Sequence, residues 1–186
     1  MDVLLPQAYL IGLIVILGVA AVVVARQIWR VRADEVTLSK LEQKDAEKPS
    51  DAASLYELGS VQLRKRLYGQ AAESLKQALK KADAAKEPPE AQAVIQNALG
   101  FALAAQNNYK SAIRHYRLAL EAKPAYPVAL NNLAFALEKQ LKLEEARDTY
   151  VRVIALDAEN KTARKRLKLI ERKAGLNPIS PKSSDG

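Results

Sequence analysis

The hydrophobic and polar positions divide the chain into an apolar N-terminal run and a long, patterned remainder. Ala8 to Ala25 is a run of 18 residues without a charge, and including Val3 to Gln7 extends it to 23 residues. A helix rises about 1.5 Å per residue, so this length matches a hydrocarbon core of roughly 30 Å. The pattern predicts a transmembrane anchor at residues 1–25.

Charges on the two sides of this run predict its orientation. The chain begins Met1-Asp2, so an acid precedes the run. Three arginines and a tryptophan follow it: Arg26, Trp29, Arg30 and Arg32. A cleaved signal peptide normally begins with a basic region, so the pattern favours a permanent anchor. The positive-inside rule then places the following domain in the cytoplasm, or in the stroma if the source is a plastid.

Residues 26–51 turn polar after the run. Their apolar residues give only a weak helical stripe: Val36, Leu38 and Leu41. We interpret the segment as a basic juxtamembrane stem or linker, which ends where Ser50 or Asp51 can cap the next helix.

From residue 52 onward, apolar and small residues recur with a period of 34. Four pairs show this spacing: Leu99 and Leu133, Gly100 and Ala134, Ala112 and Ala146, and Tyr116 and Tyr150. The period and residue types resemble the tetratricopeptide repeat (TPR), whose form is W-x2-L-G-x2-Y, then A-x3-F, then P. The resemblance implies an all-α solenoid of helical hairpins, with Gly or Ala where paired helices cross closely.

The repeat occurs in three copies. They cover residues 52–85, 93–126 and 127–160. The first copy is offset from the second by 41 residues, because an insertion at 86–92 precedes the second copy. Pro88 and Pro89 in this insertion end one helix and begin the next, so we expect both packed faces to be preserved.

Residues 161–174 form a further amphipathic segment. Their apolar side chains fall on one helical face: Ala163, Leu167, Ile170 and Ala174. The segment resembles the basic capping helix that closes such a solenoid with a polar outer face. Residues 175–186 are predicted to form a disordered tail.

Composition excludes several classes of chemistry. The chain has no cysteine, which excludes disulfides, zinc-thiolate sites, iron–sulfur clusters and a cysteine nucleophile. It has no Walker glycine loop, dinucleotide fingerprint, HExxH motif or nucleophile elbow. The only histidine, His115, lacks an acidic or nucleophilic partner at a suitable spacing, so we interpret it as a surface or packing residue. We expect that the chain is not an enzyme and that it has no catalytic, metal or cofactor site.

The first helix of each repeat is expected to line a concave surface that receives an extended peptide or a partner's helix. Aligning the repeats gives three rows of candidate groove residues: Tyr56, Asn97 and Asn131; Ser60, Phe101 and Phe135; Arg64, Ala105 and Lys139. Amides can hold a peptide backbone, and phenylalanine rings can accept apolar side chains. In the alternative interpretation, the amides satisfy local helix groups and both rings belong to the core.

Chaperone-binding TPR domains hold a terminal carboxylate with a clamp of Lys, Asn and Arg on these rows. In this chain Tyr56 and Ser60 occupy the places of the Lys and the Asn. The departure from that pattern disfavours chaperone tails as partners.

The net charge of +8 comes from the two ends of the chain. Residues 33–160 hold 18 basic and 18 acidic residues, whereas residues 161–186 hold 8 basic and 2 acidic residues. Candidate contacts to an anionic surface are Arg164, Lys165, Arg166 and Lys168. Tethering to a membrane favours anionic lipid headgroups over nucleic acid, because no reading motif or interleaved aromatic residue accompanies the charge. The alternative is a solvated cap.

The whole architecture narrows the resemblance. One N-terminal span, three repeats, a basic terminal helix and no cysteine resemble the small thylakoid proteins of cyanobacteria and plastids that assist photosystem I assembly. Membership implies a non-enzymatic assembly factor that binds photosystem I subunits or assembly intermediates at the cytoplasmic or stromal face of the thylakoid. A bacterial membrane-tethered scaffold for envelope, secretion or division machinery is the first alternative, and a lipid-surface sensor is the second.

Overall fold

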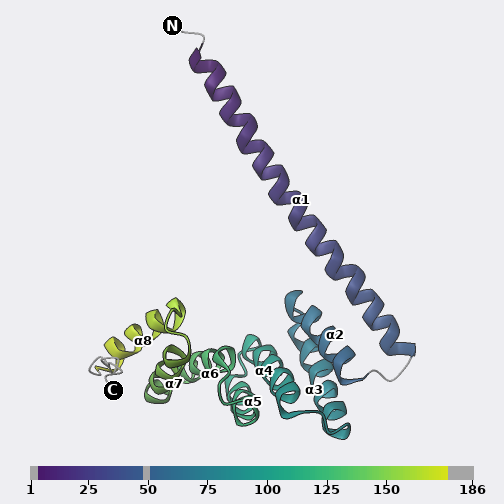
Figure 1. Cartoon of the computed structure of the whole chain (residues 1–186), viewed down its shortest axis with the longest axis vertical. Helices are drawn as coiled ribbons and strands as arrows, with labels where there is room; N and C mark the ends of the chain where they lie inside the picture. The colour runs from purple at the N-terminus through teal and green to yellow at the C-terminus, as the bar shows by residue number, and fades with distance from the viewer. Residues whose placement is uncertain (1–3, 48–50, 176–186) are drawn as a thin grey trace. The chain divides into compact units, whose positions relative to one another are not determined.

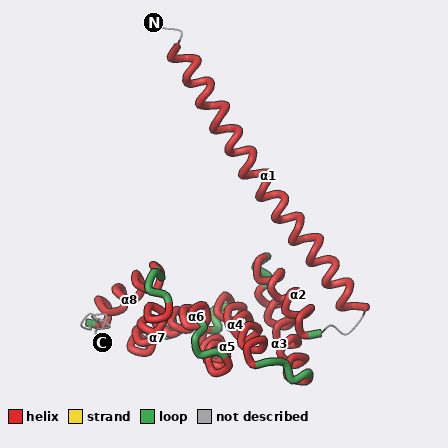
Figure 2. Tube along the Cα trace, in the orientation of Figure 1, coloured by secondary structure: helices red, strands yellow, loops and turns green. Residues whose placement is uncertain are grey.

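The computed structural model describes residues 4–47 and 51–175. Their regular secondary structure is helical, and no strand occurs in these two ranges (Figures 1 and 2). The chain divides into two compact units, Met1–Lys48 and Pro49–Gly186. The all-α fold class predicted from the sequence is therefore confirmed.

The first unit is a single helix, α1, which spans Leu4–Glu47. The segment Tyr9–Lys40 within it is long and apolar enough to cross a membrane, with a mean hydropathy of 2.5 in its most apolar window. The stem expected after residue 25 continues the same helix, because neither Gly nor Pro occurs between Gly18 and Pro49 to end it.

The second unit contains seven helices in its described part. They are α2 (Ala52–Arg64), α3 (Tyr68–Ala84), α4 (Pro89–Ala105), α5 (Tyr109–Ala122), α6 (Pro127–Lys139), α7 (Leu143–Leu156) and α8 (Lys161–Ala174). Consecutive helices pack as three hairpins, and α8 packs on α7. In addition, α2 contacts α4 and α4 contacts α6, so the first helices of the repeats share one surface. We name this surface the first-helix face.

Local sequence explains where these helices begin. The Asp51 carboxylate accepts a hydrogen bond from the Ser54 backbone N–H at 2.8 Å, as expected of the cap at this position. Asn108 and Asn160 cap α5 and α8 in the same way. Pro89 and Pro127 occupy the first turns of α4 and α6, where the missing N–H removes no helical hydrogen bond.

The small residue of the repeat lies where two helices cross closely. A Cβ atom placed on Gly100 would come within 2.6 Å of Cε1 of Tyr116, and one on Gly59 would come within 2.7 Å of Cγ of Leu75. The Tyr116 ring cannot withdraw, because it is only 1% exposed and packs in the core that the second and third repeats share. The pattern around Gly100 is therefore a packing pattern, as predicted.

Each turn within a repeat contains one residue in the left-handed region. Arg66, Asn107 and Leu141 have φ values of 62°, 61° and 58° and occupy equivalent positions in the three repeats. In each turn the next backbone N–H reaches back to the last turn of the first helix, as in Lys142 to the Leu137 carbonyl at 3.0 Å. A leucine is unfavourable here, and Leu141 is also 82% exposed.

Substitution of Gly100 by Val tests the close crossing. We expect the free energy of unfolding to fall by about 3 kcal/mol, because the new side chain overlaps the immobile Tyr116 ring. The measurement is urea unfolding of the chain in mild detergent, followed by circular dichroism. Gly69→Val is the matched control, since nothing lies within 4 Å of its Cβ position. Equal losses in the two variants would contradict the packing role.

Substitution of Leu141 by Asn tests the turn. The equivalent turn of the second repeat already has Asn107 in the left-handed region. We expect Leu141→Asn to raise the free energy of unfolding by about 1 kcal/mol, because Asn tolerates this conformation better than Leu. The reverse change, Asn107→Leu, should lower it by a similar amount. A loss of stability in Leu141→Asn would show that Leu141 has a packing role in the fold.

Candidate functional site: the first-helix face

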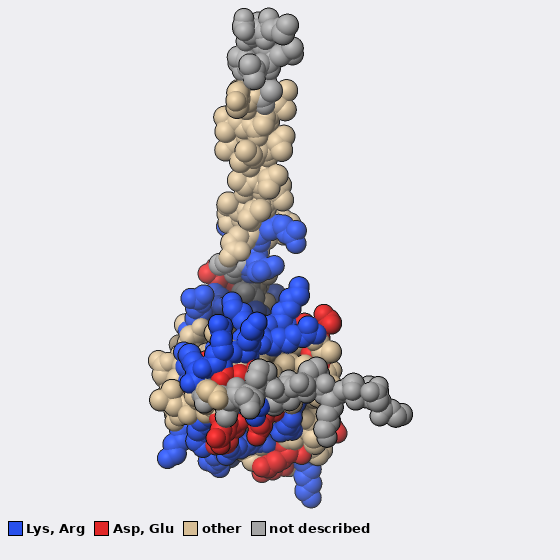
Figure 3. All heavy atoms as spheres, turned by 90° about the vertical axis from the view of Figure 1, so that its left-hand side faces the viewer, with Lys and Arg blue, Asp and Glu red and all other residues tan. Residues whose placement is uncertain are grey.

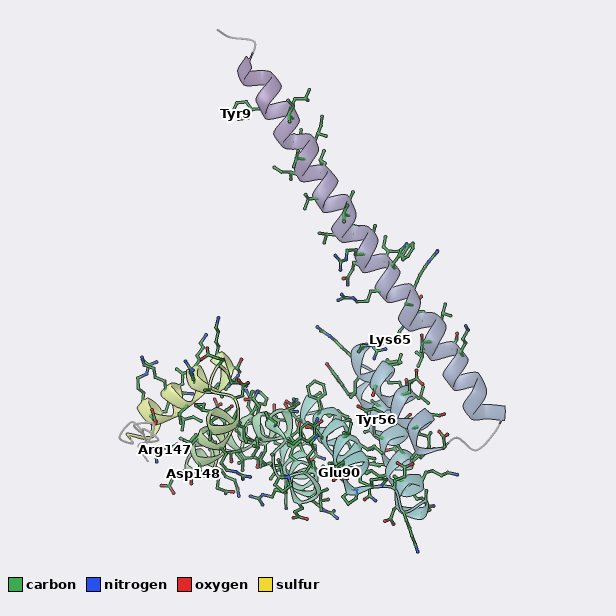
Figure 4. The ribbon with its side chains drawn as sticks, viewed as in Figure 1. Tyr9, Tyr56, Lys65, Glu90, Arg147 and Asp148 are labelled. Carbon is green, nitrogen blue, oxygen red and sulfur yellow. The ribbon has the colours of Figure 1, made fainter. Side chains whose placement is uncertain are left out.

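The structure places all nine residues of the three predicted groove rows on α2, α4 and α6. Phe101 is the most open aromatic member, with 44% of its surface exposed. Arg64, Ala105 and Lys139, which form the third row, are exposed. The remaining members are half-buried: Tyr56, Ser60, Asn97, Asn131 and Phe135. Figure 4 marks Tyr56 on α2. The face is thus lined with partly covered aromatic and polar side chains, and Phe101 is not a core residue.

A hydrogen-bonded amide network crosses the middle of this face. The Asn132 Nδ2 group donates to Oδ1 of Asn97 at 3.0 Å, and Nδ2 of Asn97 donates to the Tyr126 hydroxyl at 3.5 Å. Burial and the nearby Tyr56 phenol raise the pKa of Tyr126, and the hydrogen bond from Asn97 lowers it. Asn97 therefore binds neighbouring side chains as well as facing the groove.

The second predicted amide, Asn131, is less available. The Oδ1 atom of Asn131 is buried and has no hydrogen-bond partner among the described residues. Ser60 is satisfied locally, since its hydroxyl donates to the Tyr56 carbonyl at 2.8 Å within α2. Ser60 thus follows the interpretation in which polar groups on the first helices satisfy local helix groups, whereas Asn131 has a buried oxygen that no described residue satisfies.

Phe135 forms the centre of a cluster at the α6 end of the face. The Tyr109 ring approaches it edge-on, with 6.5 Å between the centroids. Nζ of Lys139 lies 5.4 Å and Cζ of Arg166 lies 4.7 Å from the Phe135 centroid. Arg166 also donates to Oε2 of Glu138 at 2.9 Å. Cations over an aromatic ring are favourable, so this cluster combines an apolar contact with positive charge.

Arg166 connects the capping helix with this face. It comes from α8, and the sequence grouped it with Arg164, Lys165 and Lys168 as a contact for an anionic surface. Arg164 instead donates to the Ala158 carbonyl and pairs with Glu159 at 3.2 Å. Lys165 and Lys168 are exposed. The structure therefore divides the predicted basic group: Arg164 and Arg166 contact other residues of the domain, whereas Lys165 and Lys168 face the solvent.

Comparison with known proteins identifies the family. A tetratricopeptide repeat family model matches residues 93–126. The chain is 33% identical over 170 residues to the protein named ycf37 from Guillardia theta, and this match covers 91% of the chain and 94% of the relative. The chain belongs to the ycf37 family of tetratricopeptide repeat proteins. The chain is also similar to the chloroplastic TPR domain-containing protein PYG7 of Arabidopsis thaliana. The two are 32% identical over 159 residues, which is 86% of the chain. The chain spans about half (52%) of PYG7.

A solved structure shows the same fold. The first TPR of Spaghetti (RPAP3), bound to an HSP90 peptide, superimposes with a TM-score of 0.62 and 22% identity, covering 67% of this chain and 94% of that chain. The tetratricopeptide repeat proteins are a family of protein–protein interaction scaffolds and not a family of enzymes.

Several contributors to the site were not predicted from the sequence as groove residues, among them Asn132 and Tyr109. Tyr126 comes from the connection before α6, Arg166 comes from the cap, and Glu138 on α6 accepts the hydrogen bond from Arg166. Lys123 also lies over the Tyr126 ring, with Nζ 5.0 Å from its centroid. Repeat alignment gave no signal for Tyr126, because the equivalent positions of the neighbouring repeats hold Gln92 and Asn160, which are not aromatic.

His115 lies on α5, away from this network. Its Nδ1 atom is 2.7 Å from Oε1 of Gln96 on α4. Burial, followed by the charges of Arg114 and Lys76, lowers the pKa of His115. Among the described residues, no group of three or more His, Cys, Asp or Glu residues could hold a metal ion. His115 therefore joins two helices of one repeat.

The lowered pKa of His115 predicts how stability depends on pH. The unfolded chain binds the imidazole proton at a higher pH than the folded chain does, so the free energy of unfolding should fall as the pH drops through about 6.5. Urea unfolding across this interval measures the effect, and His115→Gln should remove this dependence of the free energy of unfolding on pH.

Arg114→Gln should raise the pKa of His115, because it removes a neighbouring positive charge. NMR of the single imidazole measures this pKa. The control Arg152→Gln, on α7, should leave it unchanged.

Proposed function

We propose that the chain is a membrane-anchored TPR scaffold that assists photosystem I assembly at the cytoplasmic or stromal face of the thylakoid. The observation that supports this most is the long match to a ycf37 protein. The match is longer than the part of the chain that follows α1, so it includes part of the apolar helix as well as the repeats. The chloroplastic PYG7 relative agrees with a plastid or cyanobacterial setting.

Exposed apolar residues support α1 as the anchor. Large apolar side chains are exposed along its whole length from Tyr9 to Trp29, and a surface of this kind needs lipid or another protein to cover it. Twenty residues separate these two aromatic side chains, which corresponds to about 30 Å of helix. The pair therefore fits the two interfaces of a bilayer. Arg30 and Arg32, which follow Trp29, favour a cytoplasmic or stromal repeat domain.

The first-helix face is the proposed binding surface for the partner. Phe101 offers an apolar contact, and the Phe135 cluster adds positive charge from Lys139 and Arg166. An extended segment of a photosystem I subunit or assembly intermediate, with apolar and acidic side chains, would complement this surface. The RPAP3 domain shows that a TPR fold can hold a peptide. The role needs no catalytic group, metal or cofactor on this chain.

Affinity purification of the tagged full-length chain tests this function. The chain is recovered from mildly solubilised native membranes, and mass spectrometry identifies the proteins that accompany it. We expect photosystem I subunits to be enriched over other abundant membrane complexes. Phe101→Ser should lower their recovery roughly tenfold, because it removes an exposed apolar contact without altering the core.

Leu156→Ser is the matched control, since Leu156 is 48% exposed and lies on α7 rather than on the first-helix face. Its recovery of partners should equal that of the unmodified chain. Enrichment of envelope, secretion or division proteins, with photosystem subunits at background, would contradict the assembly role. An equal loss in both variants would contradict the assignment of the binding surface.

A further inference from the structure

A straight stripe of cations runs along the outer side of α8. Lys161, Lys165, Lys168 and Arg172 follow one another at spacings of four, three and four residues. With 3.6 residues per turn, this spacing holds all four within an arc of about 60° along roughly 16 Å of helix. All four are exposed. Figure 3 shows Lys and Arg side chains gathered at this end of the repeat domain.

The stripe lies opposite the packed side of the helix. Ala163 and Ile170 are fully buried, and their positions fall on the other side of α8. None of the four stripe residues forms an ion pair with a residue in the described part of the chain. The acid of this helix, Glu171, is largely buried, with Oε1 3.8 Å from Nε of Arg147. The stripe is therefore a positively charged surface without acidic residues.

We propose that this stripe binds the anionic headgroups of a lipid bilayer and so holds the end of the repeat domain against the membrane. The inference rests on the proposed anchor, which keeps the domain permanently near a membrane. Four aligned cations match a plane of negative charge, and each cation near an anionic leaflet adds to binding. A protein interface needs apolar or aromatic side chains at its centre, and the stripe contains none.

The test uses the full-length chain in nanodiscs. The chain has no cysteine, so Thr162→Cys introduces one exposed, uncharged labelling position next to the stripe. A fluorophore there is quenched when it approaches a lipid with a nitroxide on its headgroup. We expect quenching to be about threefold stronger with phosphatidylglycerol present than with phosphatidylcholine alone, and to fall at high salt.

Two variants with the same loss of charge separate the stripe from net charge. Replacing Lys161, Lys165, Lys168 and Arg172 by Gln should abolish the difference between the two lipids. Replacing Lys80, Lys81, Lys110 and Arg114 by Gln should preserve it, because these four exposed cations lie on α3 and α5. Circular dichroism checks that both variants keep the helical fold.

Equal quenching in the two lipids, or an unchanged response in the stripe variant, would overturn the proposal. Failure of the chain to enter either type of nanodisc would instead overturn the proposed anchor, and the lipid contact with it. If the stripe variant loses photosystem I subunits in affinity purification while its quenching is unchanged, the stripe binds protein rather than lipid, and the inference is wrong.

Discussion

The close crossing of two helices within each repeat is the contact on which the rest of the domain depends. Gly100 allows α4 to approach the buried Tyr116 ring on α5, and Gly59 allows the same approach to Leu75. Because each crossing fixes the direction of the first helix, equivalent residues on α2, α4 and α6 come to share one surface. The first-helix face is therefore a consequence of core packing.

Most of the fold was predictable because a repeat presents the same physical requirement several times. A single small residue is weak evidence that two helices cross closely. Small residues at the equivalent position of all three repeats, Gly59, Gly100 and Ala134, are strong evidence for three helical hairpins. The continuation of α1 beyond the apolar run was harder to foresee. Its polar segment carries only a weak apolar stripe, so the absence of Gly and Pro before Pro49 was the clearer indication that the helix continues.

The site was predictable only in part, for a different reason. Alignment of repeats identifies which side of a first helix faces the groove, and this places Phe101 and Phe135. It does not indicate which side chains meet between repeats, because that depends on the offset from one hairpin to the next. The bond between Asn97 and Asn132, and the approach of Arg166 to Phe135, are contacts of this kind.

Arg166 also affects how the end of the solenoid opens. A stack of repeats has contacts only between neighbours, so its terminal elements unfold locally before the centre. The capping helix α8 packs on α7, but the bond from Arg166 to Glu138 fastens it to α6 as well. Fraying of α8 must therefore break a contact with the first helix of the last repeat. The cap is consequently held at two points, on α7 by packing and on α6 by this ion pair, so its opening separates it from both helices of the last hairpin.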